Sequence, residues 1–159
     1  MRPPAPQVVS WTARLRELGI TLPSVAAPVA AYVPAVRSGA QVFTSGQLPF
    51  VDGVLAGTGK LGAEVSAEQG KELARICALN ALAAVDGLVG LDAVVRVVKV
   101  TGFVASADGF TGQPGVINGA SELLGDVFAD AGVHARSAVG VAELPLGAPV
   151  EVELLVEVR

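Results

Sequence analysis

One arginine in the last quarter of the chain stands apart from the apolar residues around it. Arg136 opens a run that reads as a strand, and a strand would place its long side chain beside small neighbours of the same parity: Ala138, Gly140 and Ala142. A guanidinium with room around it can hold a carboxylate through two parallel hydrogen bonds. The alternative is an ordinary ion pair with an acid such as Glu122 or Asp126. The pattern alone leaves both interpretations open.

Glu151 belongs to a segment of strictly alternating residues, which predicts a final strand over residues 150–158. Its valines share one parity and indicate the core face, so that Glu151, Glu153 and Glu157 lie opposite. A carboxylate in a cleft can orient and partly deprotonate a water molecule. A solvated acidic face is the plainer interpretation, and we favour it for the two later glutamates. Residue counting does not show that Glu151 meets Arg136.

Several other side chains are candidates for a binding site, and each has an ordinary structural alternative. Tyr32 precedes a predicted strand, where a buried tyrosine that satisfies its hydroxyl is common. Ser45, Gly46 and Gln47 favour a bend where backbone approaches a ligand, or simply a bulge. Asn118 suits a polar contact or a helix-start cap. For the lone histidine, His134, and the lone cysteine, Cys77, we expect a surface residue and an inert core residue.

Four blocks of the sequence, in this order and spacing, resemble the YjgF/RidA family, also called endoribonuclease L-PSP. They are Tyr32-Val33-Pro34 with Thr44-Ser45-Gly46-Gln47-Leu48-Pro49, then Val98-Lys99-Val100-Thr101-Gly102-Phe103, then Phe110 with Asn118, and finally residues 135–153. The resemblance runs from about residue 32 to residue 158. No block is specific alone, but four in order rarely arise by accident.

This resemblance implies roles for the candidate residues. Arg136 would grip the carboxylate of a small 2-imino acid, and Glu151 would hold the attacking water. Tyr32, the segment 45–47 and Asn118 would contribute to the cleft. The family needs no cofactor and forms homotrimers whose clefts lie between subunits. Several deaminase members carry a cysteine where this chain has Ala138, a change that removes nothing required for hydrolysis.

The order of predicted elements is that of an α+β domain. We expect helices over residues 11–18, from Ser66 onward and over 116–131, and strands over 32–37, 41–45, 48–55, 93–104, 136–143 and 150–158. The resemblance implies a chorismate-mutase-like fold, with a six-stranded mixed sheet, two helices on one face and a short additional N-terminal helix. We expect an N-terminal extension over residues 1–28, mobile before Val8, and a single domain over 29–159.

One strand is apolar on both faces. Residues 94–100 alternate poorly, and two helices can cover only one face of the sheet. The other face therefore needs a cover, and a further subunit is the natural one. This expectation agrees with the trimer that the resemblance implies.

Composition restricts the classes of partner. Apolar residues make up 52% of the 159 residues, charged residues only 16%, and the net charge is −4. The eleven Lys and Arg residues are scattered, which argues against nucleic-acid binding. One cysteine and one histidine argue against a disulfide and a zinc site. We see no signal peptide and no apolar run of membrane-spanning length, and we expect a cytoplasmic protein.

The hypothesis that follows is hydrolytic deamination of small 2-imino acids to 2-keto acids and ammonia. Its main alternative is a non-catalytic module that binds small carboxylates on the same trimeric scaffold. Ribonuclease action is a third possibility, which the acidic composition and the few aromatic residues argue against.

Overall fold

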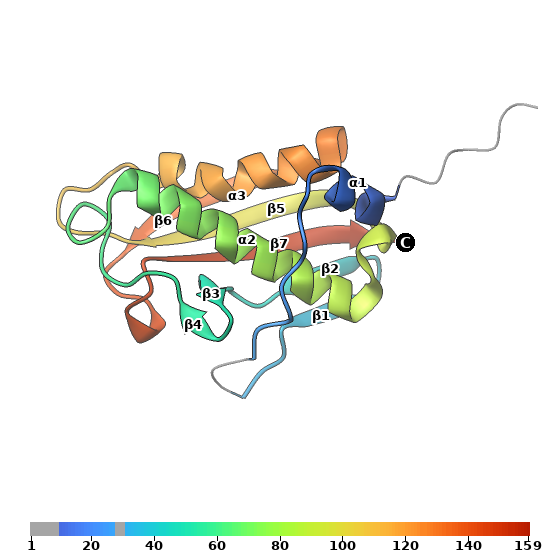
Figure 1. Cartoon of the computed structure of the whole chain (residues 1–159), viewed down its shortest axis with the longest axis horizontal. Coiled ribbons are helices and arrows are strands. Elements are labelled where there is room, and N and C mark those ends of the chain that lie inside the picture. Colours follow the sequence, from blue (N-terminus) through green and yellow to red (C-terminus); the bar gives the residue numbers. More distant parts are fainter. Residues whose placement is uncertain (1–9, 28–30) are drawn as a thin grey trace, which may run out of the picture.

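The helices and strands occur largely in the order that the sequence predicts. The computed structural model describes residues 10–27 and 31–159. Its helices are α1 (Trp11–Glu17), α2 (Ala67–Val89) and α3 (Gln113–Phe128), and its strands are β1 (Ala35–Ser38), β2 (Gln41–Thr44), β3 (Phe50–Val51), β4 (Val54–Leu55), β5 (Val94–Ala105), β6 (Ala135–Val141) and β7 (Val150–Val158) (Figure 1). The expected mobile start before Val8 lies outside the described residues.

Side-chain caps explain where two of the helices begin. Ser66 accepts a hydrogen bond from the Gln69 amide, and the Gln69 side chain accepts one from the Ser66 amide, which together form a capping box at the start of α2. Ser10 caps α1 through the amide of Ala13. Gly19 follows α1 with a φ of 68°, a left-handed conformation that suits glycine and ends the helix.

The main sheet has five strands in the order β1-β2-β7-β5-β6, not the expected six. The predicted strand over 48–55 instead folds on itself as a separate hairpin of β3 and β4. Asp52 and Gly53, with φ of 51° and 79°, form its turn, and positive φ at both positions is the hairpin geometry that matches strand twist. Within the main sheet only β5 and β6 run parallel, so the sheet is mixed as predicted.

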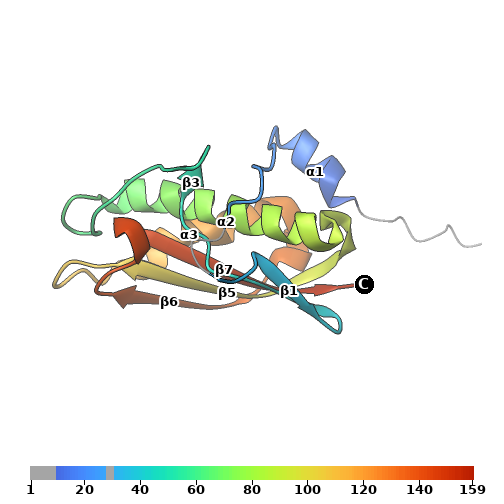
Figure 2. The ribbon, with the colours of Figure 1, turned by 90° about the horizontal axis from the view of Figure 1, so that it is seen from below.

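The helices lie on one face of the main sheet, and the other face is bare in the single chain (Figure 2). The core forms between α2, α3 and the helix-side residues of the strands, including Val97, Val100 and Leu154. On the opposite face the large apolar side chains Val36, Phe43, Val95 and Val139 are exposed. The bare face of the sheet thus keeps exposed apolar side chains, Val95 of β5 among them, that have no cover within the described part of the chain.

The N-terminal helix is tied to the rest of the chain by specific contacts. The Trp11 indole donates to the carbonyl of Val94 at 2.8 Å and meets the ring of Phe128 edge-on, with centroids 5.1 Å apart. Residues 20–27, which we call the strap, then cross the outer side of α2 toward β1 (Figure 1). Among the described residues, no helix is long and apolar enough to cross a membrane.

Candidate functional site

Arg136 lies on β6, the edge strand of the main sheet, and its side chain points toward α3. Its cross-strand partner is Val100, which is paired in turn with Leu154, and both of these side chains belong to the core under the helices. Side chains at paired positions share a face. Arg136 therefore emerges on the helix-covered face, at the edge where the core ends.

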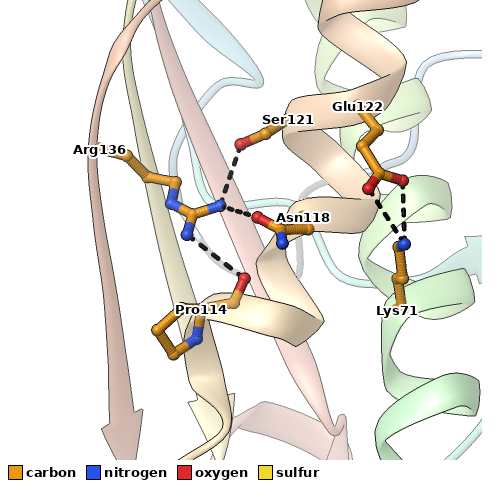
Figure 3. Close-up of polar contacts among 6 residues, drawn as sticks. All are labelled: Lys71, Pro114, Asn118, Ser121, Glu122 and Arg136. Carbon is orange, nitrogen blue, oxygen red and sulfur yellow. Dashed lines mark hydrogen bonds and ion pairs between the residues drawn. The ribbon is translucent and has the colours of Figure 1, made fainter.

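The guanidinium of Arg136 is held by three neutral acceptors of α3 (Figure 3). Nη1 donates to Asn118 Oδ1 at 2.8 Å and to Ser121 Oγ at 3.2 Å, and Nη2 donates to the carbonyl of Pro114 at 3.3 Å. A guanidinium carries five N–H groups, so two remain without a partner among the described residues. The arginine is oriented by the helix and keeps donors for another molecule.

The ion pair that the sequence left open does not form. Glu122 is paired with Lys71 on α2 at 3.0 Å, as Figure 3 shows. Over residues 10–27 and 31–159, no carboxylate lies within 4.0 Å of the Arg136 guanidinium. Its positive charge is thus oriented without being neutralised, which is the condition that binding of an anionic ligand requires.

Ser121 and His134 extend this network, and sequence reasoning missed both. His134 is not the surface residue we expected but is half-buried, with Nε2 2.9 Å from Ser121 Oγ and Nδ1 2.6 Å from the Gly132 carbonyl. The Gly132 carbonyl can only accept, so the histidine proton is on Nδ1. The Ser121 hydroxyl then donates to Nε2 while accepting from Arg136. Ser121 lies one helical turn after Asn118, and that spacing was the signal available.

Glu151 lies in a second group of candidates, beside Gly46. The residue pairs with Phe103 of β5, whose other partner Val139 is exposed on the bare face. A β-carbon at position 46 would overlap the Glu151 carboxylate, so only glycine leaves the space that this side chain occupies. Glu151 is half-buried, and this burial, with a smaller contribution from Glu153, raises its pKa.

A small cavity of about 40 Å³ adjoins Glu151 and brings four of the candidates together. Tyr32, Gly46, Gln47 and Glu151 all line it. Gln47 is held there by a reciprocal pair of backbone hydrogen bonds with Val152. The segment at 45–47 thus extends the sheet pairing through Gln47 and forms part of the cavity wall through Gly46 and Gln47. Ser45 is directed elsewhere, since its hydroxyl donates to the Val33 carbonyl at 2.6 Å.

The candidate residues therefore divide into two groups within one chain. Arg136 and Asn118 meet on the helix-covered side of the β6 edge. Glu151 projects from the other face of the sheet, because Val150 and Val152 on either side of it are buried in the core. A single chain thus does not place the Arg136 guanidinium and the Glu151 carboxylate in one cleft.

The remaining reactive side chain is the thiol of Cys77. It is fully buried in α2, with Sγ 3.7 Å from the Val150 carbonyl, and burial raises its pKa well above the ordinary value. The prediction of an inert core cysteine is confirmed. Within the described part of the chain, no three His, Cys, Asp or Glu side chains are grouped as a metal ion would require.

Comparisons with known proteins assign the family. The family model described as "YjgF/chorismate_mutase-like, putative endoribonuclease" matches residues 12–158. Protein TCP17 of Trypanosoma cruzi is 50% identical over 149 residues, which cover 92% of this chain and 93% of that protein. A Shewanella oneidensis protein, titled a "putative endoribonuclease", is 32% identical with a TM-score of 0.90, over 94% of this chain and 100% of that one.

A more distant structure carries a ligand. Escherichia coli TdcF, solved with bound serine, is 27% identical with a TM-score of 0.61, over 87% of this chain and 95% of that one. With the four sequence blocks and the α+β architecture, these matches show that the chain belongs to the YjgF/chorismate-mutase-like family.

Proposed function

We propose that the protein hydrolyses small 2-imino acids to 2-keto acids and ammonia. The substrate class is that of 2-iminopropanoate, a planar carbon bonded to a carboxylate and a protonated imine. Water adds to the imine carbon, the carbon–nitrogen bond breaks, and ammonium leaves as the carbonyl forms. A protonated imine is already electrophilic, so this reaction asks the protein only to bind the anion and to position water.

The observation that carries the proposal is the state of Arg136. Its guanidinium is fixed by Asn118, Ser121 and the Pro114 carbonyl, yet no carboxylate among the described residues neutralises it. A substrate carboxylate would find a preoriented cation with two N–H groups remaining, which is the arrangement that bidentate recognition needs. Serine in the related TdcF structure is a small molecule with an α-carboxylate, which supports the ligand class.

We assign to Glu151 the role of holding the attacking water molecule. Its raised pKa makes the carboxylate a better proton acceptor than an exposed glutamate. The adjoining cavity of about 40 Å³ is large enough for one water molecule, which needs roughly 10–15 Å³ of such space. The attack on the imine carbon and the proton transfer to Glu151 would then take place in the same small cavity.

The opposite directions of Arg136 and Glu151 are consistent with a site shared by two subunits. We propose a homotrimer in which the β6 edge of one protomer faces the Glu151 cavity of the next. The exposed apolar side chains on the bare face, such as Phe43 and Val95, supply a reason to associate. Light scattering at micromolar concentration tests this point, and a well-folded monomer would refute the shared site.

The activity is tested by supplying the imine enzymatically. A pyridoxal-phosphate-dependent serine dehydratase releases 2-aminoacrylate, which becomes 2-iminopropanoate and hydrolyses slowly without help. Keto-acid formation is followed with and without the protein. Faster release that depends on Arg136 supports the deaminase. No acceleration on any small imino acid, together with binding of 2-ketobutyrate through Arg136, would select the non-catalytic binding module instead.

The family description also names endoribonuclease action. We propose that RNA is not the substrate of this chain, because phosphate-backbone binding requires clustered cations and its Lys and Arg residues are scattered in an acidic sequence. Cleavage of single-stranded RNA that persisted through several columns and vanished in Arg136→Ala would overturn this.

A further inference from the structure

A second, larger cavity adjoins the one at Glu151. It has a volume of about 390 Å³ and lies between the strap, the β3–β4 hairpin and α2. Three residues, Ala26, Ala27 and Phe50, line both cavities, so the two lie next to each other. We call them the water compartment, next to Glu151, and the strap compartment.

The strap compartment has the size of a ligand site. Pockets for small molecules typically span about 300–1,000 Å³, and the methyl group of 2-iminopropanoate needs only a small part of such a volume. Val25 and Phe50 give it apolar walls. The strap lies close against α2, because Gly87 offers no side chain where the Val25 methyl passes. The N-terminal extension thus forms one wall of the strap compartment.

One buried polar group that lines this space has an oxygen with no hydrogen-bond partner among the described residues. Asn80 of α2 is only 2% exposed, and both hydrogens of its Nδ2 are used, toward the carbonyls of Leu48 and Phe50 at 3.1 and 3.0 Å. These two acceptors fix which way the amide is turned. Its Oδ1 accepts no hydrogen bond from any described residue.

We place that oxygen toward the strap compartment. Among the described residues, no fully enclosed side-chain nitrogen or oxygen lacks a hydrogen-bond partner. Asn80 Oδ1 is therefore open to a space from which a donor can reach it, and the strap compartment is the cavity that Asn80 lines. A buried acceptor favours a ligand that supplies an N–H or O–H group. Asp52, exposed at the rim, disfavours an anionic group there.

We infer that the strap compartment selects substrates by their side chain. The site takes 2-imino acids whose side chain is longer than methyl and ends in a neutral or cationic hydrogen-bond donor, which Asn80 Oδ1 accepts. This inference rests on the proposed function for the position of the reacting carbon near Glu151. Asn80 and the strap are specificity determinants and take no part in the chemistry.

Unreactive amino acids test the selection directly, since their α-ammonium group stands in for the protonated imine. Calorimetry compares serine, norleucine, glutamine and glutamate as ligands of the full chain. Glutamine should bind most tightly, by roughly threefold to tenfold over norleucine for one neutral hydrogen bond, and glutamate should bind most weakly. Equal affinity for glutamine and serine, or tighter binding of norleucine than of glutamine, would overturn the inference.

A filling variant keeps the test independent of Asn80, whose replacement would also strip the Leu48 and Phe50 carbonyls of their donor. Ser24 lines only the strap compartment and is exposed. Ser24→Phe should reduce glutamine affinity to that of serine. Thr21→Phe, on an exposed strap residue outside both compartments, is the matched control and should preserve the order of affinities. An unchanged glutamine affinity in Ser24→Phe would contradict the compartment's role.

Turnover of 2-iminopropanoate by the same preparations separates the two proposals. If the wild-type protein turns over this imine but does not prefer glutamine, the inference about the strap compartment is wrong and the proposed deaminase function is retained. If glutamine is preferred and Ser24→Phe abolishes that preference while no imine is turned over, the compartment stands and the proposed function fails.

Discussion

Arg136 Nη1 donates to Asn118 Oδ1 at 2.8 Å, which joins two residues from separate elements, the edge strand β6 and helix α3. This contact explains the role of each residue. The asparagine, part of whose surface remains accessible, offers its amide oxygen to a cation, and the arginine is thereby fixed without losing charge. Under the proposed function, binding of the substrate carboxylate would depend on both residues and not on the arginine alone.

Replacing Arg136 tests the grip on the substrate. Arg136→Ala should lower kcat/KM for 2-iminopropanoate at least a hundredfold, because two charge-assisted hydrogen bonds of about 1.5–3 kcal/mol each are lost. Arg136→Lys should recover little, since an ammonium reproduces neither the fork nor the three contacts to α3. Steady-state kinetics measures the loss, and far-ultraviolet circular dichroism checks the fold. Unchanged activity in Arg136→Ala would contradict both the deaminase hypothesis and the carboxylate-binding alternative.

Ser121 is a positioning residue for Arg136, and its removal should weaken binding more than chemistry. Ser121→Ala deletes one acceptor of the guanidinium, so we expect about a tenfold rise in KM with a smaller change in kcat. His134→Ala should produce a smaller rise in KM, because it acts on the arginine only through the serine hydroxyl. A larger effect on kcat than on KM in Ser121→Ala would contradict a positioning role.

Gly46 is required for space beside Glu151 rather than for backbone freedom. In Gly46→Ala the new methyl would meet the end of the Glu151 side chain, which is flexible and can turn aside. We therefore expect a small loss of melting temperature but at least a tenfold loss of kcat, since the water-holding carboxylate is displaced. The double-mutant cycle with Glu151→Ala is decisive. If Gly46→Ala still lowers kcat in that background, the glycine acts through something other than the carboxylate.

Local signals in the sequence predicted most of the fold. The start of a helix at Ser66 and the alternation in residues 150–158 each depend on near neighbours, and both predictions are confirmed. The predicted strand over 48–55 was an error of turn chemistry. Asp52-Gly53 is a strong hairpin signal, and the segment forms β3 and β4.

The sequence proposed individual candidate residues but not how they are arranged. The family blocks pointed to Arg136, Asn118, Glu151 and the bend at 45–47. The hydrogen bonds from Arg136 to α3 depend on how a helix lies over an edge strand, and no sequence spacing fixes that. Asn80 could not be singled out from the sequence, because the role of a buried asparagine depends on its hydrogen-bond partners, here the Leu48 and Phe50 carbonyls.

Close helix packing makes Gly119 a stability determinant. A β-carbon there would overlap the backbone carbonyl of Lys71 on α2, and backbone atoms cannot move aside as a side-chain end can. Gly119→Ala should destabilise the fold by about 1–3 kcal/mol, as overpacking does. Gly125, in the same helix, is exposed with open space at its β-carbon position, so Gly125→Ala should stabilise by roughly 0.5–1 kcal/mol. Urea unfolding of both variants checks the contrast, and equal effects would contradict it.

The raised pKa of Glu151 makes opposite predictions for stability and for activity. The folded state binds the Glu151 proton more tightly than the unfolded state, so this group's contribution to the free energy of unfolding falls as pH rises through the interval between its ordinary and its raised pKa. At neutral pH the buried charge is therefore a cost. Glu151→Gln, which carries no charge, should be more stable than the wild type at pH 7.

The stability advantage of Glu151→Gln should disappear as the pH is lowered below about 4.5, the ordinary pKa of a glutamate, because the wild-type carboxyl is then protonated in both states. Over the same pH range the variant should have lost the acid limb of the wild-type kcat profile together with most of its activity at neutral pH, since an amide cannot accept a proton from water. Thermal unfolding from pH 4 to pH 8 and kcat at each pH measure the two trends on the same samples. A variant less stable than the wild type at pH 7, or one with wild-type kcat, would show that Glu151 holds the fold rather than the water.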